Sequence, residues 1–181
     1  MVKSMTASLF SEVPTLSDEN IVLRRLNIHD AEALRELVDK SHVYRHLPVF
    51  LFEQKYADTR VVISRLYDEC LKDSLILVVF KYGEFCGLAE MYGYRSEIHK
   101  VSVGYRLLER KWGQGIAANV LKLMVEYLLN KTDIELITAS TMCANAASAR
   151  VLQKNGFELV VSGALEDWGY EEPVLTDKWI R

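Results

Sequence analysis

A pair of glycines, Gly113 and Gly115, follows a segment typical of a β-strand and precedes a segment typical of a helix. Residues 100–107 alternate between polar and apolar side chains, whereas residues 117–125 carry apolar side chains at helical spacing. The first turn of a helix has backbone N–H groups without partners, and the helix dipole adds partial positive charge there. Glycine permits positive φ angles and lets a ligand approach the main chain closely. The sequence therefore predicts a binding site for a phosphate or pyrophosphate group at this turn.

A second pair of polar side chains, Asn145 and Ser148, lies further along the chain. Residues 134–141 are typical of a strand, and the helix that follows starts at Asn145 and is ended by Asn155-Gly156. An asparagine at this position has two interpretations. Its amide can hydrogen-bond a ligand at the helix N-terminus, or it can cap its own helix.

The order of these motifs resembles the GNAT superfamily of N-acetyltransferases: glycine turn, long helix, strand, N-x-x-S, then Gly156-Phe157. Within it, residues 18–181 most resemble the RimJ/RimL-like branch of ribosomal-protein alanine N-acetyltransferases. The resemblance implies a GNAT fold of the mixed α/β class, with helices on both faces of a mostly antiparallel central sheet of about six to seven strands. It also implies that the family's fourth and fifth strands, here residues 100–107 and 134–141, splay apart.

The resemblance implies acetyl-CoA as co-substrate and no metal. The family's Q/R-x-x-G-x-G/A motif fits best on residues 112–117, with Trp112 in the Q/R position, and it can also be placed on residues 110–115. In the preferred placement the backbone of residues 112–117 holds the pyrophosphate. Arg110 and Lys111 then either reach a CoA phosphate or form a solvated basic pair.

Two further contacts with the co-substrate are implied by the resemblance. The backbone of Tyr105 and Leu107 would bind the pantetheine arm and the acetyl oxygen, and Asn145 would hydrogen-bond the pantetheine. The expected cofactor-binding set is therefore Tyr105, Leu107, Arg110, Lys111, Trp112, Gly113, Gln114, Gly115, Ile116, Ala117, Asn145 and Ser148.

Acetyl transfer to an amine needs a proton donor for the leaving thiolate and a base for the amine. Many superfamily members use a tyrosine as the donor at the position of Leu152, which has no proton to give. The resemblance makes Ser148 the candidate donor instead, either by proton transfer or by hydrogen bonding to the thiolate. Several members carry a glutamate base where this chain has Val101. The candidate bases here are Glu166, Asp167 and Glu90.

The function implied is an acetyl-CoA-dependent N-acetyltransferase that acetylates a primary amine by direct attack in a ternary complex. The amine would be a protein N-terminus or a small molecule, and residues 44–50 would wall its pocket. The apolar residues Leu152 and Val101 leave an alternative open, a non-catalytic acyl-CoA-binding or regulatory module on the same fold. Monomer and homodimer are equally compatible with the sequence.

Composition limits the other classes of function. Half of the 181 residues are hydrophobic, with few glycines and prolines, which indicates a single globular domain over residues 18–181 after a mobile lead-in over residues 1–17. The net charge of −3 argues against a nucleic-acid partner or a polybasic membrane contact. Apolar runs are too short for a membrane span, and the isolated cysteines Cys70, Cys86 and Cys143 are typical of a reducing cytoplasm.

Hydrophobic periodicity predicts the remaining elements. Helices are expected over residues 30–40 and 53–72, and further strands over residues 21–26, 75–80, 85–94, 158–162 and 174–180.

Overall fold

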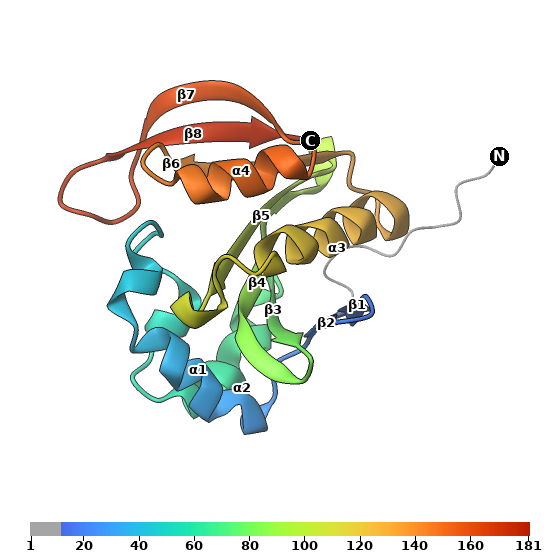
Figure 1. Cartoon of the computed structure of the whole chain (residues 1–181), viewed down its shortest axis with the longest axis vertical. Helices are drawn as coiled ribbons and strands as arrows, with labels where there is room; N and C mark the ends of the chain where they lie inside the picture. Colours follow the sequence, from blue (N-terminus) through green and yellow to red (C-terminus); the bar gives the residue numbers. More distant parts are fainter. Residues whose placement is uncertain (1–11) are drawn as a thin grey trace.

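The computed structural model describes residues 12–181, and within that range a single sheet of eight strands forms the centre of the fold (Figure 1). Its strand order is β1-β2-β3-β4-β5-β6-β8-β7, and every neighbouring pair is antiparallel except β5 with β6. The strands are β1 Leu16–Ser17, β2 Ile21–Arg24, β3 Ser74–Lys81, β4 Glu84–Arg95, β5 Lys100–Leu107, β6 Leu136–Met142, β7 Glu158–Glu166 and β8 Val174–Ile180. The mixed sheet confirms the expected fold class.

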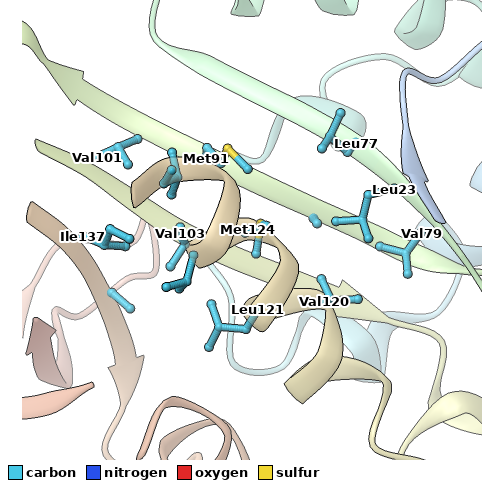
Figure 2. Close-up of a cluster of buried hydrophobic side chains, with 14 of the residues drawn as sticks. Leu23, Leu77, Val79, Met91, Val101, Val103, Val120, Leu121, Met124 and Ile137 are labelled. Atoms are coloured by element: carbon cyan, nitrogen blue, oxygen red, sulfur yellow. The ribbon is translucent and has the colours of Figure 1, made fainter. Parts of the chain in front are cut away.

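Four helices cover the two faces of the sheet, namely α1 Ala31–Val38, α2 Thr59–Cys70, α3 Ile116–Lys131 and α4 Ala146–Lys154. Because side chains alternate along a strand, β3 and β4 contribute to two separate hydrophobic cores. One core joins residues of β3, β4 and β5 to α3 and α4, and the other joins the remaining buried residues of β3 and β4 to α1 and α2. Figure 2 shows the first core, in which Val120, Leu121 and Met124 of α3 lie over Val101 and Val103 of β5.

The strands β5 and β6 separate after a short paired segment. Their parallel pairing is limited to Lys100–Ser102 against Leu136–Thr138. Beyond Ser102, β5 stays paired with β4, while β6 stays paired with β8. The second half of β5 therefore has an unpaired side, as the sequence predicted.

The sheet gains one strand over the expected range because Leu16–Ser17, predicted to belong to the lead-in, pairs with β2. Leu16 packs against the core beneath α3. The part of the predicted lead-in over residues 1–11 lies outside the described residues.

Most predicted boundaries differ from the structure by at most two residues, but two of them differ by more. Helix α2 begins at Thr59 rather than at residue 53, because the Asp58 side chain caps it by accepting a hydrogen bond from Arg60 N–H at 2.9 Å. Strand β7 continues past residue 162 to Glu166, because pairing with β8 resumes after an irregularity that includes Gly163, whose φ is 72°. Glu166 is therefore the last residue of a strand and not part of the loop after it.

Candidate functional site

A cleft of about 1750 Å³ occupies the space where β5 diverges from β6. Its walls come from β5, β6, the first turns of α3 and α4, the segment 42–55 and the end of β7. Because the separation of the strands opens the sheet itself, residues from both faces of the sheet contribute to this one cleft. The cleft is thus the place where groups from opposite faces can act on the same molecule.

The glycine turn borders the cleft at the start of α3. Gly113 and Gly115 have φ angles of 70° and 74°, and a Cβ placed at either would meet no other atom within 4 Å. The backbone conformation therefore favours glycine here, and the space beside it is open. The first helical hydrogen bond runs from Asn119 N–H to Gly115 O at 3.2 Å, so the N–H groups ahead of it have no partner within the helix.

The set of available backbone donors is narrower than the sequence predicted. Trp112 N–H already donates to Glu109 O at 2.9 Å, in a short turn before the glycines. The Trp112 indole Nε1 donates to Leu107 O at 2.9 Å, which ties the turn to the end of β5. The donors open to a ligand therefore start at Gly113, and Leu107 O is engaged by the indole.

The residues at this turn fit a pyrophosphate through the main chain rather than through charged side chains. The Arg110 guanidinium pairs with Glu36, and the Lys111 ammonium pairs with Glu84. Arg110 and Gln114 are not among the residues that line the cleft, whereas Lys111, Gly113 and their neighbours up to Ala117 are, apart from Gln114. The basic pair is thus engaged by surface carboxylates.

The N-x-x-S motif forms the start of α4, as its spacing predicted. Asn145 Oδ1 accepts a hydrogen bond from Ser148 N–H at 3.1 Å, so Asn145 caps its own helix. Ser148 Oγ lies 3.2 Å from the Tyr105 hydroxyl, close enough for a hydrogen bond in either direction. Burial raises the pKa of Tyr105, while its hydrogen bond to Ser148 acts in the opposite direction. Tyr105 and Ser148 therefore form a pair of hydroxyl groups that lines the cleft.

A role for the Tyr105 side chain was not predicted from the sequence, because the resemblance assigned only the backbone at this position. The strand pattern carried the signal. Tyr105 alternates with Val101 and Val103, which places it on the sheet face that α3 and α4 cover.

The other face of the sheet contributes a buried ion-pair network centred on Arg106. Its Nη1 donates to Glu90 Oε2 at 2.8 Å, and its Nη2 donates to Glu53 Oε2 at 2.7 Å. Arg106 Nε also pairs with Glu53, whose carboxylate accepts a hydrogen bond from the Tyr44 hydroxyl. The side chains of Arg106 and Glu53 are each 2% exposed, whereas that of Glu90 is 14% exposed and lines the cleft.

Burial acts in opposite directions on the pKa values of Glu90 and Arg106. It raises the pKa of Glu90, and the Arg106 guanidinium offsets only part of the rise. Burial also works to lower the pKa of Arg106, but the carboxylates of Glu53 and Glu90 outweigh it, so the net shift is upward. The guanidinium therefore stays charged, and Glu90 is a carboxyl group that binds a proton more readily than usual.

The other two candidate bases lie in different surroundings. Glu166 pairs with Lys178 and accepts a hydrogen bond from Trp168 Nε1 at 3.0 Å. Burial works to raise the pKa of Glu166, but its partners outweigh burial and lower the pKa. Asp167 is exposed and accepts a hydrogen bond from Gly169 N–H at 2.8 Å. Both residues line the cleft together with Glu90.

The segment predicted to wall the acceptor pocket does border the cleft. Val49 N–H donates to Trp168 O at 2.9 Å, and the Tyr170 hydroxyl donates to Leu47 O at 2.6 Å. These bonds connect the segment 42–55 to the loop between β7 and β8, so the two sides of the cleft are bridged at this end.

Membrane-spanning helices and clusters of metal-ligating side chains are absent from residues 12–181. No helix in this range is long and apolar enough to cross a membrane. The same range contains no group of three or more histidine, cysteine, aspartate or glutamate side chains placed to hold a metal ion.

Comparisons with known proteins agree with this geometry. An uncharacterized N-acetyltransferase p20 of Bacillus licheniformis is 22% identical over 169 residues, covering 92% of this chain and 93% of the relative. A RimL ribosomal L7/L12 alpha-N-protein acetyltransferase in complex with coenzyme A has a TM-score of 0.78 at 20% identity, covering 94% of this chain and 97% of that one. A spermidine N-acetyltransferase from Vibrio cholerae, in complex with CoA and spermine, has a TM-score of 0.73 at 14% identity, covering 91% and 96%.

The two solved structures share the fold with this chain, and the family assignment comes from the sequence itself. The family model described as acetyltransferase (GNAT) domain matches residues 20–158, which span the sheet from β2 to β6 together with the glycine turn and α4. The chain therefore belongs to the acetyltransferase (GNAT) domain family and is an acetyltransferase enzyme.

Proposed function

We propose that this protein is an acetyl-CoA-dependent N-acetyltransferase that acetylates a primary amine by direct attack in a ternary complex. The observation that carries the proposal is the open glycine turn beside a cleft that passes between β5 and β6. The solved relatives named above hold coenzyme A, and their amines are a ribosomal protein N-terminus and a polyamine. Both kinds of acceptor are compatible with the cleft.

On the α3 side of the sheet, the chain's own groups would bind acetyl-CoA and protonate the leaving thiolate. Acetyl-CoA supplies an activated acetyl thioester and a pyrophosphate when bound. Backbone N–H groups from Gly113 to Ala117 bind the pyrophosphate with the aid of the α3 dipole. Tyr105 and Ser148 would hold a proton for the leaving thiolate at hydroxyl oxygens that line the cleft. A phenol is a better proton donor than an alcohol, which favours Tyr105 as the source of the proton and Ser148 as the group that passes it on.

On the α1 and α2 side, Glu90 is the proposed base. A general base works best when its pKa lies near the operating pH, and burial moves Glu90 in that direction. The pKa of Glu166 is lowered instead, because Lys178 and its other partners outweigh burial. Asp167 is exposed and accepts a hydrogen bond within its own turn. Glu90 therefore supplies the carboxylate that Val101 cannot, just as Tyr105 and Ser148 supply the hydroxyl that Leu152 cannot. These replacements favour catalysis over a purely binding role.

The test is release of free thiol from acetyl-CoA in the presence of a panel of amines and N-terminal peptides. We expect thiol release that depends on the amine, with the acetylated amine as product by mass spectrometry. Calorimetry with CoA serves as the control for cofactor binding. Tight CoA binding without turnover for any acceptor would contradict the proposal and favour a binding module.

A further inference from the structure

Arg106 connects two carboxylates that come from distant parts of the chain. Glu53 lies in the short helical turn Phe52–Gln54, which follows the proposed acceptor wall of residues 44–50, and its neighbours Phe52 and Gln54 line the cleft. Glu90 lies in the middle of β4, opposite Gly104 of the neighbouring strand. The guanidinium reaches both, with hydrogen bonds of 2.7 Å to Glu53 and 2.8 Å to Glu90. A planar guanidinium fixes the direction of each carboxylate that it binds, which a lysine ammonium does less well.

The charges around Glu90 are few within the described part of the chain. Burial raises the pKa of the Cys70 thiol to about 12 and also raises that of the Tyr92 phenol, so both are uncharged near neutral pH. The negative charges that act on Glu90 are those of Glu53 and Asp73, and Arg106 supplies the opposing positive charge. Without Arg106, a carboxylate at position 90 would face two negative charges in a buried site, which strongly favours its protonated form.

We propose that Arg106 is a positioning residue: held in place by Glu53, it keeps the Glu90 carboxylate charged and directed into the acceptor side of the cleft. This inference rests on the proposed function for the role of Glu90 as base. It adds that Glu53, in the turn after the acceptor wall, controls the protonation state of that base. The geometry that carries it is the buried contact of one guanidinium with two carboxylates of unequal exposure.

The proposal predicts that the titration of Glu90 shifts in opposite directions when Arg106 and when Glu53 loses its charge. The change Arg106→Gln removes the positive charge, so Glu90 takes up its proton at a higher pH and the acidic limb of the rate profile moves up by about 1 to 3 units. The change Glu53→Gln removes a like charge and preserves the shape of the side chain, so the acidic limb moves down. The change Arg106→Lys retains the charge, and we expect the acidic limb of its rate profile to lie near that of the unaltered protein.

The protonation of Glu90 is also measurable without turnover. In protein labelled with ¹³C at the glutamate side chains, the Glu90 carboxyl carbon is assigned by its loss in Glu90→Gln and is then titrated by NMR. A merely structural network would lower stability in each variant, but it would not move this titration up in one variant and down in the other. Thermal unfolding of each variant shows that the fold is intact.

The outcomes separate the inference from the function on which it rests. Opposite shifts of the Glu90 titration, matched by the rate profile, support both. Opposite NMR shifts without a matching change in the rate profile support the network and exclude Glu90 as the base. Titrations that stay unchanged, or that move in the same direction in Arg106→Gln and Glu53→Gln, overturn the inference. If Arg106→Gln does not fold, Glu53→Gln is sufficient as the test. A Glu90 titration that is unchanged or moves to higher pH in that variant overturns the inference.

Discussion

Tyr105 and Arg106 are neighbours in β5, but their side chains lie on opposite faces of the sheet and in unlike surroundings. The Tyr105 face offers main-chain N–H groups, an open glycine turn and a pair of hydroxyl groups. The Arg106 face offers three buried charges that hold one another. The first face is suited to binding an anion by neutral donors, and the second to holding a base in a chosen charge state.

The splay of β5 from β6 makes both of these faces accessible from one cleft. In a fully paired sheet the two faces would be separated by a continuous layer of backbone. Here the pairing of β5 with β6 ends at Ser102, so a molecule lying in the opening can contact groups from both faces. The comparison can be tested by altering each face in turn.

The largest expected effect follows from Glu90→Gln. Loss of a general base lowers turnover by about 10² to 10⁴-fold, whereas CoA affinity stays unchanged because Glu90 lies on the other face from the glycine turn. The matched controls are Glu166→Gln and Asp167→Asn, which remove the other two candidate bases of the cleft and should cost far less. Initial rates at saturating acetyl-CoA provide the measurement, and a larger loss in either control would place the base at the end of β7.

Gly115→Asp should abolish most CoA binding. A carboxylate at the start of α3 would meet the pyrophosphate, and like charges at that distance cost several kcal/mol, or about 100-fold or more in affinity. Gly115→Asn is the control, because asparagine adopts the same positive φ and differs from aspartate only in charge. Calorimetry should find the asparagine variant the stronger binder, and equal affinities would count against a pyrophosphate at this turn.

Tyr105→Phe and Ser148→Ala should each reduce turnover by up to about tenfold, the worth of one hydrogen bond. If the two hydroxyls act as a unit, the double variant loses no more than the worse single variant. The kinetic measurement is kcat against KM for acetyl-CoA, since a role at the leaving sulfur lowers kcat more than it raises KM. Additive losses would show that the two groups act separately.

The smallest effect is expected for Arg110→Gln. The guanidinium is half exposed and already paired with Glu36, so its removal should change CoA affinity by less than about fivefold. Calorimetry at low and high salt is the measurement. A strong, salt-dependent loss would show that Arg110 leaves Glu36 and contacts a CoA phosphate.

The Tyr105 face was largely predictable from sequence, because its parts are local. Glycine spacing, a helix start and N-x-x-S are read within a few residues, and β5 ends where its alternation predicts. The competition for Leu107 O was not predictable, because nothing in the sequence indicates that the Trp112 indole turns back to it.

The Arg106 face was mostly hidden. Apolar spacing predicted a helix from residue 53 onward, whereas the Asp58 cap delays the helix and leaves Glu53 in a separate turn. Arg106, the partner of Glu53, lies 53 residues away in the chain, and a single sequence carries no signal for a contact of that range.

The central claim is that a diphosphate is held by main-chain amides at the start of α3 and lies on the Tyr105 face of the cleft. Titrating CoA into ¹⁵N-labelled protein tests it most directly through the amide resonances. We predict that the signals of Gly113, Gly115 and Ala117 shift most, while that of Lys131, at the other end of α3, stays in place. Saturable binding that leaves the glycine-turn amides unmoved would contradict the account.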